Sequence, residues 1–457
     1  MPKRVWPAWA SLTEILDLLR LSVPIAVSRA AFMFMLLTDT IVLGRNEPGE
    51  VPYILISWFP ISLVIGFTMG LLLGVSVLTA ELSGRGQAAR SGRVFRRGLL
   101  TALICGGGSA GILFLSADSV FRLLQFEGEF HAGVTDVARI LSFALMAQLL
   151  NTATTFYLEA LRKPVLVAVT MYIGVVVNLI FDLAFVGGYW GMPQMGASGV
   201  AIATTGTSVT LFFVFLTLAA LHTPAFKSSG PSPAGEWVRQ LRVGLGMAVS
   251  NLAEFGSFNF THVMAGWISL AAATVYGMVF QVIAFVFMSF LGLGTATNVR
   301  VAERFGRGEE AGVVNASRLG VTTCVLVALT CGALLLILKT NIAAVFVQPD
   351  AIVEGEAIYP LLVEFIAFAG LILVFDGVQN VASMASRARG LSWTPASVHL
   401  GSYVLVMIPF AYILGLKLER GVQGMMEAVL MASVIASVAQ IVILERVVPK
   451  SDAYKNG

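Results

Sequence analysis

The sequence predicts an all-α membrane protein with twelve transmembrane helices in two six-helix bundles, related by a parallel internal repeat. Composition is the first observation: of 457 residues, 57% are apolar and 12% are charged, and the mean hydropathy is +0.85. Soluble domains carry about 25% charged residues. The other two observations are a series of apolar segments and a pattern that recurs along the chain. The composition excludes a cytosolic enzyme, a disordered protein and a secreted disulfide scaffold.

Twelve segments are long and apolar enough to cross a bilayer, which requires about 20 residues. Short polar stretches, or stretches with glycine and proline, separate them. The first segment is too long for the core of a signal peptide and more spans follow at once, so we interpret it as retained. The segments cover residues 21–44, 53–80, 94–116, 136–160, 164–187, 196–221, 243–268, 271–297, 317–338, 357–386, 394–416 and 422–445.

The distribution of basic residues predicts the orientation of these spans. With the N-terminus in the cytoplasm, 22 of the 29 Lys and Arg residues fall in cytoplasmic loops and tails and six fall outside. Basic residues accumulate on the cytoplasmic side of membrane proteins. We therefore expect a multi-pass protein of the inner membrane with both termini in the cytoplasm.

The chain contains an internal duplication. Ala-Glu-Leu-Ser-Gly-Arg-Gly at 80–86 recurs as Ala-Glu-Arg-Phe-Gly-Arg-Gly at 302–308, and the same offset of 222 residues matches Ala-Val-Ser at 26–28 to 248–250. Further along, Tyr172 matches Tyr403. Because each half has an even number of spans, both halves enter the membrane from the same side. We expect one bundle at residues 1–221, a cytoplasmic linker at 222–240 and a second bundle at 241–457.

Ionisable side chains in the first half mark a candidate site, because a charge at bilayer depth is costly. Asp39 lies late in the first span, about four turns after Pro24, which allows that helix to kink. Asn178 and Asp182 are four residues apart and share one helix face. We interpret the three polar residues as a proton or cation switch; the alternative is a structural hydrogen bond between helices.

A second candidate site lies in the second half. Glu254 shares one stripe of the seventh span with three polar side chains, and Asp376 is followed one turn later by another. Oxygen-rich groups with carboxylates suit a hard cation such as Na⁺, or a proton, better than a transition metal. Glu254 and Asp376 are therefore candidate Na⁺ ligands. The supporting polar residues are Asn251, Ser257, Thr261 and Asn380.

Other features of the sequence indicate helix packing rather than a chemical role. The glycines at 66, 70 and 74 allow close helix approach, and the three cysteines lie in apolar runs without metal-ligand spacing. The sequence has no phosphate-binding loop and no zinc-protease motif. We therefore expect no enzyme activity, no ATP hydrolysis, no bound cofactor and no nucleic acid partner, and we expect an ion gradient to supply the energy.

Together these motifs resemble the multidrug and toxic compound extrusion (MATE) transporters over nearly the whole chain. The resemblance implies export of organic cations and drugs in exchange for Na⁺ or H⁺. Glu254 and Asp376 resemble the cation site of the NorM branch, whereas Asp39, Asn178 and Asp182 resemble the acidic cluster of the DinF branch. The matching pieces are Thr38-Asp39-Thr40, Ala80-Glu81 with Gly84-Arg85-Gly86, Asn178 to Asp182, Gly196 to Thr204, Gly244, Glu254 to Gly266, and Phe375-Asp376-Gly377-Val378-Gln379 with Arg389-Gly390.

We therefore expect a monomeric secondary antiporter, embedded in membrane lipid, that binds small lipophilic or cationic molecules. The main alternative is a flippase for a lipid-linked precursor. A flippase cavity needs basic residues for phosphate, and Arg29 is the only basic residue deep in a span. A channel is disfavoured by the two-bundle duplication, and an intramembrane enzyme by the absence of a nucleophile and base.

Overall fold

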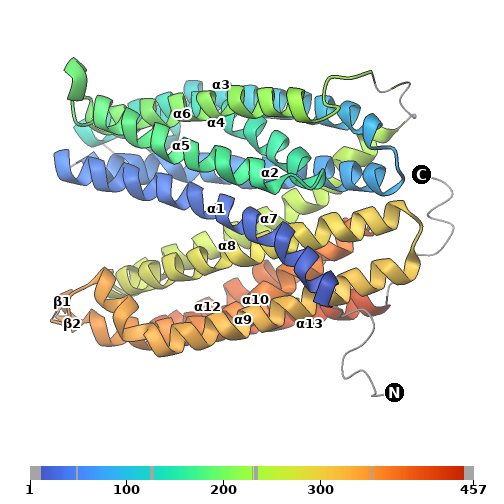
Figure 1. Ribbon diagram of the computed structural model, residues 1–457. Coiled ribbons are helices and arrows are strands. Elements are labelled where there is room, and N and C mark those ends of the chain that lie inside the picture. The colour runs from blue at the N-terminus through green and yellow to red at the C-terminus, as the bar shows by residue number, and fades with distance from the viewer. Residues whose placement is uncertain are drawn as a thin grey trace. The chain divides into compact units, whose positions relative to one another are not determined.

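The computed structural model describes residues 12–47, 50–123, 128–228, 230, 235–350, 352–353 and 355–446 (Figure 1). Within these residues, twelve long helical segments follow one another. The single-helix segments are α1 (Leu12–Asn46), α2 (Val51–Gly84), α3 (Ser91–Leu123), α4 (Gly128–Ala160), α5 (Pro164–Phe185), α6 (Gly196–His222), α7 (Glu236–Ile268), α8 (Leu270–Gly306), α9 (Glu310–Phe346), α10 (Ile358–Ala388) and α13 (Gly421–Arg446).

The remaining long segment, residues 393–417, changes its helical form along its length. It begins as α11 (Trp393–His399), continues as the π-helix η4 (Leu400–Met407) and α12 (Ile408–Ala411), and ends as the π-helix η5 (Tyr412–Lys417). Short 3₁₀ turns occur at η2 (Ala88–Arg90) and η3 (Tyr189–Gly191). The strands β1 (Ile352–Val353) and β2 (Glu356–Ala357) form an antiparallel pair, in which Ile352 is opposite Ala357.

The long helices confirm the prediction of an all-α membrane protein. Among the described residues, 11 helical segments are long and apolar enough to cross a membrane. The twelfth, α7, is 33 residues long, but it carries polar groups such as Asn251, Glu254 and His262 that lower its hydropathy. Linker residues 229 and 231–234 lie outside the described residues, as does the chain after 446.

The helices form two compact units, which divide inside helices rather than at loops. One unit is Val27–Ala248, and the other combines Met1–Ala26 with Val249–Gly457. Helices α1 and α7 therefore each contribute to both units, and the two division points are 222 residues apart, which is the offset of the sequence repeat. The boundaries at 221 and 241 that the sequence predicts lie at the loop that connects the two halves. The boundaries of the compact units instead depend on which helices pack together.

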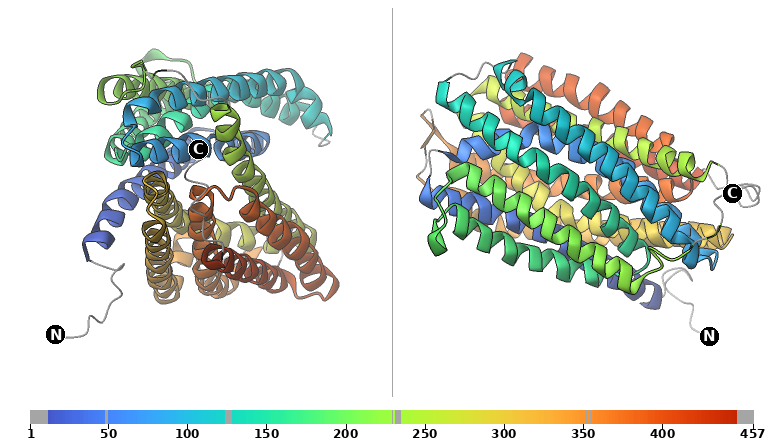
Figure 2. Two further views of the ribbon diagram at one scale, coloured as in Figure 1. Left: turned by 90° about the vertical axis from the view of Figure 1, so that its right-hand side faces the viewer. Right: turned by 90° about the horizontal axis from the view of Figure 1, so that it is seen from above.

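In the unit Val27–Ala248, α4 packs against α2, α3 and α6, and these helices run side by side in both views of Figure 2. Glycines on α2 allow the beginning of α7 to lie against it. A Cβ on Gly74 would lie 2.1 Å from the carbonyl oxygen of Gln240, and one on Gly244 would lie 1.7 Å from that of Leu71. The predicted packing role of the glycine-rich stretch is confirmed at Gly70 and Gly74.

In the other unit, α10 is the central helix and packs against α8, α9 and α13. Two basic residues at the end of α8 hold the beginning of α1. Arg304 Nη2 lies 2.8 Å from the Glu14 carboxylate, and Arg300 forms an ion pair with the same residue. These ion pairs explain why the first residues of α1 belong to this unit.

Candidate functional site

Three helices of the unit Val27–Ala248 build a buried polar cluster, the first acid site, from Asp39, Asn178, Asp182 and Thr204. The Asn178 side chain donates through Nδ2 to Asp39 Oδ1 at 2.9 Å. Thr204 donates through its hydroxyl to Asp39 Oδ2 at 3.2 Å. The structure therefore brings together all three residues that the sequence selects in the first half, with Asp39 from α1 and the other two from α5.

The carboxyl of Asp182 lies beside that of Asp39, so that either carboxyl, when protonated, can donate to the other. Asp182 is fully buried, and within the described part of the chain no N–H or O–H group of another residue donates to either of its oxygens. Two ionised carboxylates in contact repel each other strongly, and neither can donate a hydrogen bond. A single proton shared by the pair satisfies both groups.

Local sequence explains how the helices reach this site. Helix α5 begins at Pro164, whose fixed φ suits a first helical turn, and it ends one turn after Asp182. The beginning of α6 lies against that end, since a Cβ on Gly199 would be 2.5 Å from the carbonyl oxygen of Phe185. This close approach brings Thr204, one and a half turns further along α6, to the carboxylate of Asp39.

The unit Val249–Gly457 contains the second acid site, which consists of Glu254, Asp376, Gln379 and Tyr403. The amide of Gln379 bridges the two acids: Nε2 is 3.2 Å from Glu254 Oε1 and 3.3 Å from Asp376 Oδ1. The Tyr403 hydroxyl donates to Asp376 Oδ1 at 2.9 Å. Glu254 on α7 and Asp376 on α10 are 6% and 3% exposed. The structure therefore joins the two acids that the sequence selects in the second half.

The π-helix η4 positions two side chains at the second acid site. His399 ends α11 immediately before η4, and Tyr403 lies four residues later. The Nδ1 atom of His399 is 3.6 Å from Glu254 Oε2, and the rings of His399 and Tyr403 lie 5.7 Å apart. A π-helical turn is wider than an α-helical turn and often occurs at functional sites. This segment therefore presents an imidazole to one acid and a phenol to the other.

Two of the four supporting residues that the sequence selects lie against α8. Thr261 Oγ1 accepts from the Tyr276 hydroxyl at 2.8 Å, which directs it toward α8. Asn380 faces Gly294 on α8, where a Cβ would lie 2.6 Å from its Oδ1 atom. Asn251 and Ser257 are buried on α7. The sequence did not select Gln379, although its position three residues after Asp376 places it on the same helix face.

At both acid sites, the groups around the carboxylates are hydrogen-bond donors rather than additional oxygen ligands for a metal ion. Among the described residues, no group of three or more His, Cys, Asp or Glu side chains is arranged to hold a metal ion. At the second acid site, Gln379 and Tyr403 already donate to the carboxylates. A Na⁺ ion bound by Glu254 and Asp376 must share these oxygens with the donors.

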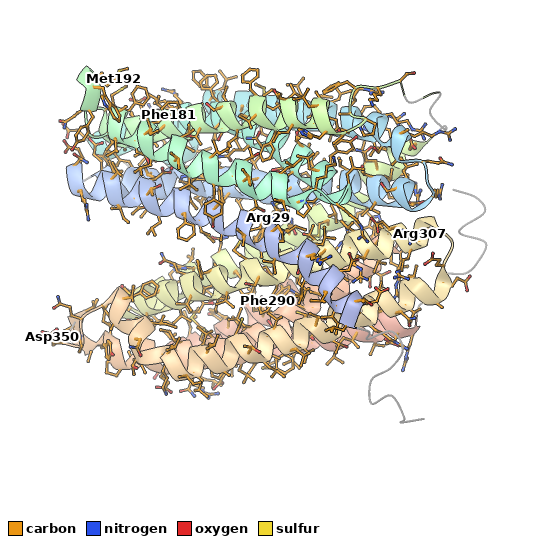
Figure 3. All side chains as sticks on the ribbon, in the orientation of Figure 1. Arg29, Phe181, Met192, Phe290, Arg307 and Asp350 are labelled. Carbon is orange, nitrogen blue, oxygen red and sulfur yellow. The ribbon has the colours of Figure 1, made fainter. Side chains whose placement is uncertain are left out.

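A third buried charge cluster in the unit Val27–Ala248 joins α1 to the end of α4. Arg29 donates through Nη2 to both carboxylate oxygens of Glu159, each at 3.1 Å, and its guanidinium lies 5.9 Å from the centre of the Phe156 ring (Figure 3). The Glu159 side chain is fully buried. The structure thus gives Arg29, the basic residue deep in the first span, a partner that spacing alone could not identify.

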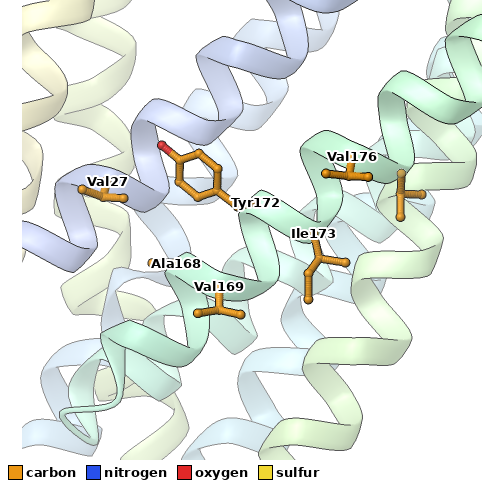
Figure 4. Close-up of a pocket in the computed structure, with 7 residues that line it drawn as sticks. Val27, Ala168, Val169, Tyr172, Ile173 and Val176 are labelled. Carbon is orange, nitrogen blue, oxygen red and sulfur yellow. The ribbon is translucent and has the colours of Figure 1, made fainter.

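An apolar groove of about 620 Å³ runs along α5 beside α1 (Figure 4). Val27 contributes from α1, and the other lining residues belong to α5. The ring of Tyr172 lies 6.4 Å from that of Phe34, so it reaches across to α1. The groove offers an apolar surface without charged side chains, separate from the acids of the first acid site.

Comparisons with known proteins agree over almost the entire chain. The MatE family model matches residues 24–184 and 247–413. The chain is 33% identical over 442 residues to a probable multidrug resistance protein NorM of Caulobacter vibrioides, covering 96% of this chain and 92% of that one. It is 24% identical over 415 residues to the multidrug resistance protein NorM of Vibrio cholerae, covering 88% of each chain.

Solved structures confirm the fold. The crystal structure of a eukaryotic MATE transporter superposes with a TM-score of 0.86 and 17% identity, covering 97% of this chain and 98% of that one. An outward-facing multidrug resistance MATE family transporter gives a TM-score of 0.85 and 19% identity, with 97% of each chain covered. The relatives are named as multidrug resistance proteins and the solved structures as transporters, and none of these names is that of an enzyme.

Proposed function

Because this chain belongs to the MatE family of membrane transporters, we propose that it is a secondary antiporter of the bacterial inner membrane, with both termini in the cytoplasm. It exports organic cations and other lipophilic drugs from the cytoplasm in exchange for H⁺ or Na⁺. The names of its relatives, which are multidrug resistance proteins, support the substrate class. No ATP and no bound cofactor take part, and the monomer is the transporting unit.

The contact between Asp39 and Asp182 is the observation that carries this proposal. In the absence of another donor to Asp182 among the described residues, the pair is stabilised by one proton. Loss of that proton leaves two buried charges side by side, which changes the stability of the arrangement of α1 and α5. The first acid site therefore takes up and releases the coupling proton.

The second acid site takes up the second coupling ion, either H⁺ or Na⁺, at Glu254 and Asp376. Its bridging amide, Gln379, contacts both acids, so occupancy of one carboxylate affects the other. Coupling requires that the ion and the drug bind the two transport conformations with different affinity. Ion binding to the acids then favours release of the drug outward and resets the carrier.

The test is export of a fluorescent organic cation from proteoliposomes, driven first by a pH gradient alone and then by a Na⁺ gradient alone. Asp39→Asn and Glu254→Gln are measured in parallel. We expect a pH gradient to drive export and Asp39→Asn to abolish it. If only Na⁺ drives export and only Glu254→Gln stops it, the first acid site is not the coupling site. Absence of export under both gradients would contradict the antiporter proposal and favour the flippase.

A further inference from the structure

Arg387 is a fully buried guanidinium in the unit Val249–Gly457, and it is the penultimate residue of α10. Its hydrogen-bond partners are neutral: it donates to the hydroxyls of Ser383 and Ser250. Among the residues that the structure describes, its Nε atom has no hydrogen-bond partner and no carboxylate lies within ion-pair distance of its guanidinium. A buried charge requires compensation from an opposite charge nearby.

Comparison of the two repeats shows that a buried arginine with only neutral hydrogen-bond partners is particular to the second half. Glu159 is the penultimate residue of α4, and Arg387 is the penultimate residue of α10. Each of them contacts the stretch that includes the repeated Ala-Val-Ser. This tripeptide lies at the point where the chain passes from one compact unit to the other. In the first half, Arg29 follows that tripeptide and pairs with Glu159. In the second half, Asn251 stands at the position of Arg29 and has no charge with which to compensate Arg387.

The contacts of Arg387 point to Glu254 as the compensating charge. Ser250, which accepts from Arg387, lies one helical turn before Glu254 on α7, about 6 Å along the helix axis. On α10, Arg387 donates to Ser383, which lies one turn after Gln379, the residue that donates to Glu254. The other ionisable groups that face this region are Asp376 on α10, His399 and Tyr403 on the segment 393–417, and the Cys324 thiol on α9, which faces Asp376.

We propose that Arg387 is the resident counter-charge of Glu254, neutralising this carboxylate whenever the second acid site holds neither H⁺ nor Na⁺. Glu254 and Asp376 supply two negative charges and Arg387 supplies one positive charge. Without a bound ion, the second acid site therefore carries one net negative charge. The pairing of charges is independent of the transport reaction.

Thermal unfolding of the purified full-length protein tests the pairing without any transport measurement. We expect Arg387→Gln to lower the unfolding midpoint by about 5 °C or more, because it leaves Glu254 buried without compensation. Adding Glu254→Gln should restore most of that loss. The double variant Arg387→Gln with Asp376→Asn is the matched control, and its unfolding midpoint should recover less of the loss. Additive effects of Arg387→Gln and Glu254→Gln would overturn the proposal, as would failure of both Arg387→Gln and its double variant to fold.

Discussion

Asn178 donates its side-chain amide to Asp39 at 2.9 Å, although the two residues lie 139 positions apart in the chain. Thr38, next to Asp39 on α1, donates in return to Asn178 Oδ1 at 3.1 Å. Neighbouring residues of α1 thus make reciprocal contacts with one residue of α5. This exchange fixes the orientation of Asp39, so that its carboxyl meets Asp182 and Thr204 rather than rotating away from them.

The first prediction separates the transport role of the acid pair from a structural one. Asp182→Asn replaces one acid with an amide that can donate to Asp39, so the buried pair no longer needs a proton. We expect proton-driven export to fall to background, while the thermal unfolding midpoint stays equal or rises. Export is measured in proteoliposomes and unfolding by scanning fluorimetry.

Thr40→Ala is the control for this variant. Thr40 lies next to Asp39, but its hydroxyl donates only to the carbonyl of Leu36 on its own helix. Export by Thr40→Ala should match that of the unchanged protein. Full proton-driven export by Asp182→Asn would show that Asp39 couples transport without its partner.

The second prediction concerns the phenol at the second acid site. Tyr403→Phe removes the hydroxyl that donates to Asp376, so a buried carboxylate loses one donor at a cost of about 1–3 kcal/mol. We expect a lower unfolding midpoint and reduced export under an ion gradient. Tyr172→Phe is the matched control, since Tyr172 corresponds to Tyr403 in the repeat but faces the apolar groove. Equal effects of both variants would argue against a specific role for the Tyr403 hydroxyl.

The sequence predicts the spans and the duplication because both depend on local information. Hydropathy is a property of consecutive residues, and the repeat is visible in residue identities. The sequence also selects the pairs Asp39 with Asp182 and Glu254 with Asp376, because acids are rare at bilayer depth. The division of α1 and α7 between the two compact units could not be predicted from loops, since it depends on contacts such as Glu14 with Arg300 and Arg304.

Apart from Asn178, the neutral partners of the acids are the part that the sequence does not reveal. Gln379 and Thr204 are polar residues in spans that contain many other polar residues, and only tertiary packing selects them as donors. From its place near the end of a span, the sequence predicts Arg387 to be one of the cytoplasmic basic residues. Its complete burial and its contact with Ser250 depend on how α7 and α10 pack.

The third prediction tests the close approach of α2 to the beginning of α7. Gly74→Ala places a methyl group 2.1 Å from the carbonyl oxygen of Gln240, and backbone cannot move aside as a flexible side chain can. We expect a loss of about 1–3 kcal/mol in the free energy of unfolding, from overpacking. Gly107→Ala on α3 is the control, because its Cβ would meet no atom within 4 Å. It should leave stability unchanged or raise it, because alanine favours helix.

The last prediction concerns the ion pair between Arg29 and Glu159. Glu159→Gln leaves a largely buried guanidinium without its counter-charge, and breaking a buried pair in this way costs about 3–5 kcal/mol. The double variant with Arg29→Met should recover much of this loss, because neither charge then remains. Urea or thermal unfolding of the single and double variants measures both effects.

Glu445→Gln provides the comparison for the buried pair. Its partner, Arg318, and Glu445 itself are 44% and 41% exposed, and such exposed pairs contribute about 1 kcal/mol or less. The Glu159 variant should therefore lose several times more stability than the Glu445 variant. Equal losses would mean that the bidentate contact at 3.1 Å does not compensate the burial of Arg29, and that α1 is held beside α4 by apolar packing around Phe156 instead.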